Sequence, residues 1–170
     1  MKPAVILLGM MGSGKTTVGR MLAEARDVEF QDTDAILSRR LGRSIPAVFD
    51  LYGEEAFREH ETAVLRSLEP ASQVVSTGGG IVLAASNWVE FRRLGITIFL
   101  DVPVDVLVER LATARRRRPL LEVEDWQTRL RDLHAARLPL YRQADLNLEC
   151  GSGSLEETLE SLQTLIGDRA

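Results

Sequence analysis

The most constraining feature of the sequence is a short apolar run that is followed at once by a glycine-rich loop and an amphipathic segment. Residues 4–8 read Ala-Val-Ile-Leu-Leu, which is typical of a strand buried on both faces of a parallel sheet. Beyond the loop, apolar side chains recur every three or four residues between Val18 and Ala25, which predicts a helix over residues 15–26. A strand, a loop and a helix in this order are typical of an α/β protein.

The loop between these segments matches the phosphate-binding pattern G-x-x-x-x-G-K-[ST] at every fixed position. It reads Gly9-Met10-Met11-Gly12-Ser13-Gly14-Lys15-Thr16. Glycines allow backbone N–H groups to turn inward and form an anion site, and the N-terminus of the following helix adds its positive end. In this pattern the lysine reaches the β- and γ-phosphates, and the hydroxyl after it can coordinate Mg²⁺. The match predicts binding of a nucleoside triphosphate but does not identify the phosphate acceptor.

Short apolar runs and segments with helical spacing continue to alternate along the chain. Further strands are expected over residues 28–32, 74–76, 96–100 and 146–150. Helices are expected between them, over residues 35–41, 88–94, 104–111 and 126–137. This alternation predicts a three-layer α/β/α fold with a central five-stranded parallel sheet.

Residues that favour helix ends mark the other helices. Ser44 is expected to cap a short helix, distinct from a long helix around Phe57 that ends at Pro70. Ser154 and Glu157 form the pattern of a capping box at the start of the last helix. The core-facing side chains of that helix are expected to be Leu155, Leu159, Leu162 and Ile166.

Length and composition limit the domain organisation and the classes of function. A chain of 170 residues fits one domain, and we expect a single unit over residues 1–170. A mobile lid is expected at about residues 112–124, where four arginines and a proline interrupt the periodicity. The net charge is −4 and no run approaches the ~20 apolar residues of a membrane span, so neither nucleic acid nor a membrane is expected as a partner. A single cysteine, Cys150, excludes an internal disulfide, and we expect a cytoplasmic enzyme.

Two aspartates follow the expected second strand, and they are the first candidates for chemistry beyond the phosphate loop. In a doubly wound sheet the carboxyl end of each strand faces the ligand crevice. Asp32 could hold Mg²⁺ directly or through water, and Asp34 could accept a proton from a substrate hydroxyl. The alternative is that Asp34 caps the following helix and Asp32 is solvated. Because the chain is short and lacks the N-K-x-D element of GTPases, a small-molecule kinase is the favoured function.

Seven segments, in this order, resemble the shikimate kinase family, which is related to the nucleoside monophosphate kinases. They are Gly9–Thr17, Asp32-Thr33-Asp34, Gly42-Arg43-Ser44-Ile45, Phe57-Arg58, Thr77-Gly78-Gly79-Gly80, Arg118-Pro119-Leu120-Leu121 and Arg137-Leu138-Pro139-Leu140-Tyr141. Very many proteins share the first segment, whereas the other six together are specific to this family.

The resemblance implies a P-loop kinase fold and ATP-dependent phosphorylation of the 3-hydroxyl of shikimate, with Mg²⁺, on the pathway to chorismate and the aromatic amino acids. The family's shikimate contacts correspond to Asp34, Arg58, Gly79, Gly80 and Arg137. Its ATP contacts correspond to Gly12, Ser13, Gly14, Lys15, Thr16, Thr17 and Arg118, and its metal ligands to Thr16 and Asp32. The resemblance assigns the transfer itself to Lys15, Asp34 and Arg118. The third strand ends in Ser76-Thr77 without an acid, so Asp32 is expected to replace the usual aspartate of the second nucleotide motif.

The residue types suit such an acceptor. Arg58 and Arg137 can form forked hydrogen bonds to the shikimate carboxylate. Glu61 lies three residues after Arg58 on the same helix and could orient its guanidinium group. Phe49 and Phe57 could pack against the apolar edge of the ring.

One departure from the family pattern and two other functions leave alternatives open. The family often has an arginine seven residues before the Arg-Pro pair of the lid, where it packs on adenine. Here that position is Leu111, so Arg110, or one of residues 115–117, would make the contact, or the contact is absent. The nearest alternative function is another small-molecule kinase, such as a gluconate kinase, and a second is a catalytically silent nucleotide-binding module. We expect a monomer.

Overall fold

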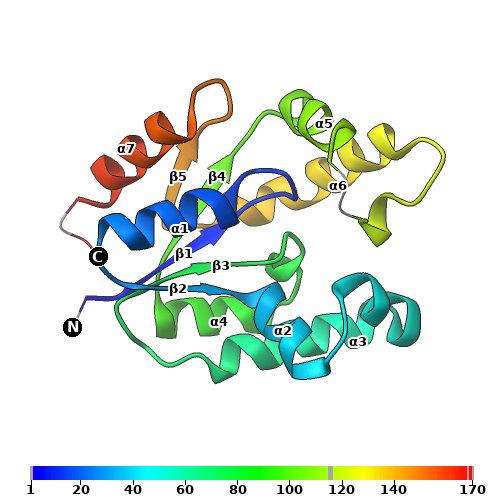
Figure 1. The fold of residues 1–170 in the computed structure, drawn as a ribbon, viewed down its shortest axis with the longest axis horizontal. Helices are drawn as coiled ribbons and strands as arrows, with labels where there is room; N and C mark the ends of the chain where they lie inside the picture. The colour runs from blue at the N-terminus through cyan, green and yellow to red at the C-terminus, as the bar shows by residue number, and fades with distance from the viewer. Residues whose placement is uncertain (1, 115–116, 168, 170) are drawn as a thin grey trace.

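A five-stranded, all-parallel sheet forms the centre of the computed structural model, which describes residues 2–114, 117–167 and 169 (Figure 1). The strands are β1 (Ala4–Leu8), β2 (Glu29–Asp32), β3 (Gln73–Ser76), β4 (Gly95–Asp101) and β5 (Leu146–Glu149). They lie in the order β2-β3-β1-β4-β5. The predicted architecture is therefore confirmed, and β1 with its phosphate loop lies in the middle of the sheet.

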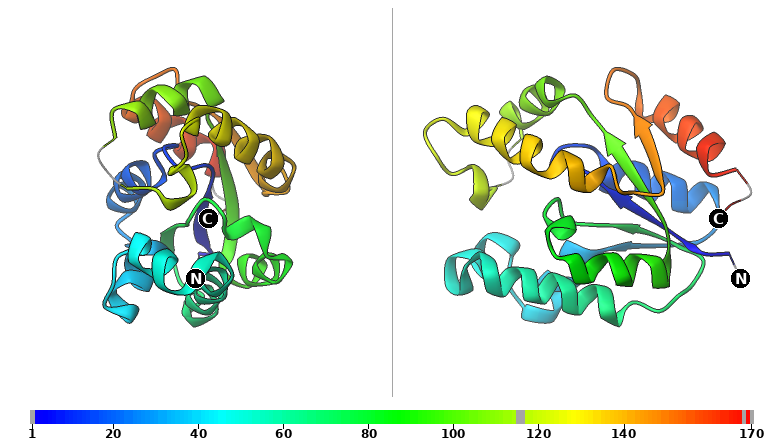
Figure 2. Two further views of the ribbon diagram at one scale, coloured as in Figure 1. Left: turned by 90° about the vertical axis from the view of Figure 1, so that its right-hand side faces the viewer. Right: turned by 180° about the vertical axis from the view of Figure 1, so that it is seen from behind.

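Helices cover both faces of the sheet (Figures 1 and 2). They are α1 (Lys15–Ala25), α2 (Thr33–Leu41), α3 (Ile45–Ser67), α4 (Ala85–Leu94), α5 (Val104–Ala112), α6 (Trp126–Tyr141) and α7 (Leu155–Ile166), with 3₁₀ turns η1 (Ile81–Leu83) and η2 (Pro119–Leu121). Alternate side chains of β1 enter different cores, since Val5 and Leu7 pack with α1 and α7 while Ile6 and Leu8 pack with α3, α4 and α6. All residues of β1 are buried, as its continuous apolar run predicts.

Several predicted boundaries need correction. The chain from Ile45 to Ser67 is one helical run with a kink at Gly53 (φ 79°, ψ 176°), so the two helices expected there follow each other without a loop. Only glycine adopts such a conformation readily. Helix α2 starts two residues earlier than expected because Asp32 caps it, its Oδ1 accepting a hydrogen bond from the N–H of Ala35 at 3.1 Å. Helix α6 continues through Pro139 to Tyr141 rather than ending near residue 137.

The last helix agrees with expectation at its start and only in part along its inner face. Ser154 and Glu157 form the capping box. Leu162 and Ile166 are fully buried, whereas Leu155 in the first turn is 41% exposed and lies outside the core, contrary to the prediction. Among the described residues, no helix combines the length and the apolarity that a membrane crossing requires.

Candidate active site

Strand β1 ends in the phosphate loop, which holds a buried lysine. Gly12 and Gly14 have φ values of 82° and 93°, in the left-handed region that favours glycine. Lys15 is 7% exposed, and its Nζ donates hydrogen bonds to the carbonyl oxygens of Gly9 and Met10, both at 2.8 Å. Burial lowers the pKa of Lys15 to about 8, so the side chain is a largely desolvated cation at neutral pH. A phosphate group that reached it would provide the missing negative charge.

A hydroxyl and a carboxylate meet beside this loop. Thr16 Oγ1 donates to Asp32 Oδ2 at 2.9 Å and lies 3.3 Å from Ser76 Oγ. Asp32 and Ser76 are register partners on β2 and β3, so the carboxylate of β2 occupies the neighbourhood that an acid at the end of β3 would have filled. Asp32, not Asp34, caps the following helix, so the alternative role considered for these aspartates is wrong.

A hollow of about 100 Å³ lies next to the phosphate loop. Helices α2 and α3, the glycine turn after β3, residues 117–120 and α6 line it, and they contribute Asp34, Arg58 and Arg137 among others. Phe49 and Phe57 form one wall, with ring centroids 4.4 Å apart. The cavity therefore combines two guanidinium groups, a carboxylate and an aromatic wall.

Two acidic residues hold Arg58 in this cavity. Its Nη1 donates to Glu61 Oε2 at 2.5 Å, and its Nη2 donates to Glu54 Oε1 at 2.9 Å. The guanidinium group lies against Gly80, where an added Cβ would be 2.3 Å from Arg58 Cζ. Any larger residue than glycine at position 80 would displace the arginine. The predicted pairing of Arg58 with Glu61 is present. Glu54 was not predicted, although it lies four residues before Arg58, a spacing that favours ion pairs on a helix.

Arg137 is the second cation of the cavity, and it is 2% exposed. Its Nη1 atom is buried and has no hydrogen-bond partner among the described residues. Burying a cation without full pairing is costly. The arrangement is therefore suited to an anionic ligand that reaches both Arg137 and Arg58.

A further hollow lies at the phosphate loop, and it shares part of its lining with this cavity. Both are lined by Met11, Asp34, Gly78, Gly79 and Arg118. The nucleotide side adds Gly12, Gly14, Lys15, Thr16, Thr17 and Asp32, and the acceptor side adds Gly80. Ser13, within the phosphate loop, is buried and lines neither hollow, and its Oγ accepts a hydrogen bond from Lys15 at 3.2 Å. The structure thus brings all the sequence-predicted site residues together, with Asp34 and Arg118 at the junction.

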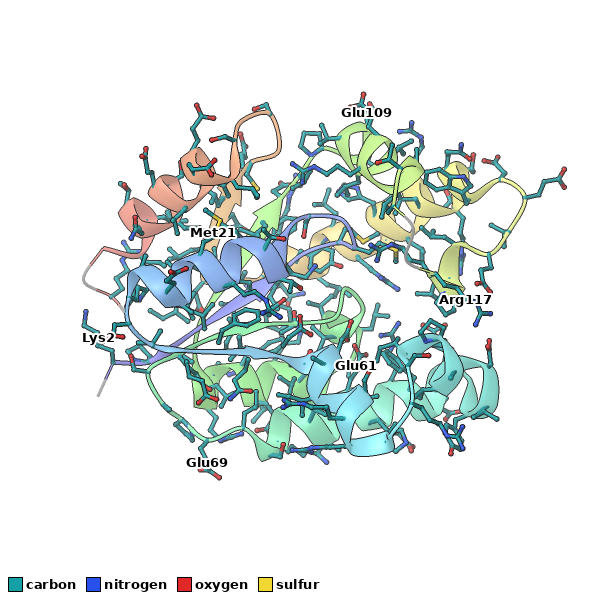
Figure 3. The ribbon with its side chains drawn as sticks, viewed as in Figure 1. Lys2, Met21, Glu61, Glu69, Glu109 and Arg117 are labelled. Carbon is teal, nitrogen blue, oxygen red and sulfur yellow. The ribbon has the colours of Figure 1, made fainter. Side chains whose placement is uncertain are left out.

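The segment before η2 contacts α3 through Arg117, which the sequence analysis considered only as a candidate for the adenine contact. Arg117 donates to both carboxylate oxygens of Asp50 on α3, at 2.7 and 3.2 Å, and to Glu122 Oε2 at 2.8 Å. Figure 3 shows Arg117 above α3. Sixty-seven residues separate Arg117 from Asp50, so no local pattern could have indicated this pair.

Arg110 lies at the other end of the site. Its guanidinium group donates to the carbonyl oxygens of Gly12 at 3.2 Å and Gly151 at 3.4 Å. Leu111 instead packs its side chain under Gly12. Of the candidates for the adenine contact, Arg110 is thus beside the phosphate loop, Arg117 is on the acceptor side, and residues 115 and 116 lie outside the described residues.

Glu61 makes the stability of the protein depend on pH. It is 1% exposed (labelled in Figure 3), and burial raises its pKa to about 7, although Arg58 opposes the shift. Between about pH 5 and pH 7 the unfolded chain releases this proton while the folded protein retains it. The contribution of Glu61 to the free energy of unfolding is therefore complete at low pH and decreases as the pH rises to 7.

We predict that Glu61→Gln removes this dependence. The free energy of unfolding of the wild type, minus that of the variant, should fall by about 1 kcal/mol for each pH unit between pH 5 and 7, since one proton is involved. Urea unfolding of both proteins at several pH values measures this difference in the free energy of unfolding. The lowered pKa of His134 acts in the opposite direction, but it is common to both proteins and cancels. A difference that stays constant with pH would show that Glu61 is ionised throughout.

The chain is similar in sequence and in structure to known proteins. A model of the shikimate kinase family matches residues 11–166. A shikimate kinase from Synechococcus sp. (strain RCC307) is 47% identical over 163 residues, which are 95% of this chain and 83% of that protein. The structure of the Acinetobacter baumannii shikimate kinase in complex with shikimate has a TM-score of 0.92 at 38% identity, with 99% of this chain and 96% of that chain covered. A gluconokinase from Sinorhizobium meliloti shares 18% identity at a TM-score of 0.55, covering 98% and 92%, which shows a common fold alone. The chain belongs to the shikimate kinase family.

Proposed function

We infer that the chain transfers the γ-phosphoryl group of ATP to the 3-hydroxyl of shikimate, giving shikimate 3-phosphate and ADP. The observation that supports this most directly is the shared lining of the two hollows. Lys15 and the phosphate loop are on one side, Arg58 and Arg137 are on the other, and Asp34 and Arg118 belong to both. A nucleotide and a small acid bound there would have their reacting ends next to each other, which is the main requirement of phosphoryl transfer.

In this proposal the acceptor is held by its carboxylate. Arg58 and Arg137 form charge-assisted hydrogen bonds to it, and the preformed ion pairs of Arg58 fix the direction of that guanidinium group. The ring packs against Phe49 and Phe57. Glycines at positions 79 and 80 allow the ring to approach the backbone closely.

Asp34 orients the attacking hydroxyl. The 3-hydroxyl oxygen forms a bond to the γ-phosphorus as the bond to the β,γ-bridging oxygen breaks, and the hydroxyl proton passes to the Asp34 carboxylate while ADP leaves. Lys15 and Arg118 neutralise the oxygens of the transferred group. Both cations and Asp34 are close enough to influence one another, since Asp34 and Arg118 both act on the pKa of Lys15.

The residues beside the phosphate loop suit Mg²⁺. The Thr16 hydroxyl and the Asp32 carboxylate are the hard oxygen donors that this ion prefers, and Mg²⁺ usually takes its remaining ligands from phosphates and water. We propose that Thr16 and Asp32 hold the ion, directly or through water. When bound, it would neutralise charge on the β- and γ-phosphates.

The remaining expectations belong to the same proposal. Arg110, beside Gly12 and Gly151, is the proposed adenine contact. We propose that residues 112–114 and 117–124 belong to a mobile lid that excludes water from a single catalytic unit of 170 residues. Residues 115 and 116, which the expected lid also includes, lie outside the described residues. We propose a cytoplasmic monomer that binds neither nucleic acid nor membranes, in keeping with its net charge of −4.

The function is tested by measuring ADP release with Mg²⁺, ATP and a panel of polyhydroxy acids. Shikimate should be phosphorylated, because its ring carboxylate and hydroxyls match the two arginines and Asp34. Gluconate, an open-chain acid without a ring for the aromatic wall, should give roughly 10²-fold lower kcat/KM, the order of discrimination that an apolar pocket supplies. Equal turnover of both acids would contradict the proposal.

Asp34→Asn should lower kcat by at least ~10²-fold, the scale of a lost general base, and should leave the KM for ATP nearly unchanged. Asparagine preserves the shape but cannot take the proton. Asp27→Asn, the same change at an exposed turn after α1, serves as the control and should behave like the wild type. Full turnover by Asp34→Asn would remove this residue from the mechanism.

Asp50→Asn should raise the KM for shikimate about two- to fivefold, the effect of losing an exposed ion pair, because Arg117 then holds the lid less firmly against α3. ATP hydrolysis in the absence of shikimate should rise as well. Glu59→Gln, a neutralised acid exposed on the same helix, is the matched control. If both variants have the same effect, general charge rather than the contact with Arg117 is responsible.

A further inference from the structure

Tyr141, at the end of α6, is fully buried, and the reaction proposed above gives it no task. Its ring stacks on Phe99 of β4, with centroids 4.9 Å apart and planes inclined by 12°. Its hydroxyl donates a hydrogen bond to the carbonyl oxygen of Gly79 and lies 3.4 Å from the sulfur of Met10. Arg137 also forms a side-chain hydrogen bond with this hydroxyl. A buried phenol is thus fixed by its ring in the core and connected by its hydroxyl to the glycine turn of the acceptor site and to Arg137.

The hydrogen bonds of this turn show which way its peptide groups face. The carbonyl groups of Gly78 and Gly80 accept backbone hydrogen bonds from the 3₁₀ turn η1 that follows. The carbonyl group of Gly79 is instead held by a side chain, that of Tyr141. In a trans peptide the C=O and the next N–H point in opposite directions, so the N–H of Gly80 points away from the buried tyrosine.

The peptide between Gly79 and Gly80 borders the acceptor cavity. Gly79 and Gly80 both line it, whereas Tyr141 does not. The guanidinium group of Arg58 lies against Gly80, and Arg137, one turn before Tyr141 on α6, lines the same cavity. A carboxylate that binds both arginines would therefore lie beside Gly80.

We propose that Tyr141 is a positioning residue that fixes the peptide between Gly79 and Gly80, so that its N–H faces the carboxylate of the acceptor. The proposal rests on the function proposed above. With glycine on both sides, this peptide can rotate at little cost. A rotated peptide would present its carbonyl oxygen to the carboxylate and repel it. Burial raises the pKa of Tyr141 to about 12, so the phenol retains the proton that it donates.

Tyr141→Phe keeps the ring and removes only the hydroxyl. The KM for shikimate should rise roughly tenfold, the effect of losing one hydrogen bond to a charged group, while kcat and the KM for ATP stay within about threefold. Steady-state kinetics with each substrate varied in turn measures the split. The chain has one other tyrosine, Tyr52, which is 52% exposed, and Tyr52→Phe is the matched control that should resemble the wild type.

Equal changes in both KM values, or no change in either, would overturn the positioning role, since general loosening of the core does not select one substrate. Should Tyr141→Phe fail to fold, Phe99→Leu is the second variant, since it removes the ring that stacks on Tyr141 and retains the Tyr141 hydroxyl. That variant should also raise the KM for shikimate more than the KM for ATP, and equal effects would again overturn the role.

The wild type separates this inference from the function on which it rests. If the wild type releases ADP with shikimate while Tyr141→Phe has wild-type kinetics, the function stands and the role of Tyr141 is overturned. In amide NMR spectra of the wild type, the proton of Gly80 should shift downfield when shikimate is added. An unchanged Gly80 resonance at saturating shikimate would overturn the proposed direction of this peptide.

Discussion

The parallel pairing of β1 with β3 is the constraint on which the rest of the structure depends. Leu7 is the register partner of Ser76, and the hydroxyl of Thr77 donates to the carbonyl oxygen of Leu7 at 2.8 Å. This pairing places the phosphate loop after β1 directly beside the glycine turn after β3. The next pairing fixes the position of Asp32, which lies on β2 and is the register partner of Ser76 on β3. A shift by one residue would turn these side chains to the opposite face and separate the groups of the site.

Positive charge, held partly out of water, explains why the site suits anions. Lys15 and Arg137 are almost completely buried, and Arg58 forms ion pairs with the carboxylates of Glu54 and Glu61. Electrostatic interactions strengthen as water is excluded, so a triphosphate at Lys15 and a carboxylate at the arginines gain more here than at an open surface. Glu61 lowers the free-energy cost of burying Arg58 in the free protein. The burial of the Glu61 carboxyl group raises its own pKa, although Arg58 opposes that shift.

The sequence predicted those features that depend on local pattern, and it was less successful where distant segments meet. The sequence predicted a parallel sheet but not the order of its strands. The pattern placed the phosphate loop, the end of the second strand placed Asp32, and the i, i+3 spacing paired Glu61 with Arg58, whereas the family resemblance identified Arg58 itself as a site residue. Predicted helix boundaries were wrong where a single residue changed the end of a helix. Asp32 caps α2, which therefore begins earlier than predicted, and α6 continues through Pro139. The contacts of Arg117 with Asp50 and of Tyr141 with Gly79 join segments more than sixty residues apart, so periodicity carries no trace of them.

The glycine turn shows why such long-range contacts matter for chemistry. Glycine is required there because Glu61, Asp34 and Arg58 approach so closely that a Cβ at Gly78 or Gly80 would collide with them. The same absence of side chains leaves the peptide groups without a preferred direction of their own. Their orientation must therefore come from elsewhere, and the core supplies it through the backbone bonds to η1 and the hydroxyl of Tyr141. A site that needs close approach to the backbone thus needs a rigid structure behind it, and here the end of α6 provides both Arg137 in the cavity and the tyrosine behind it.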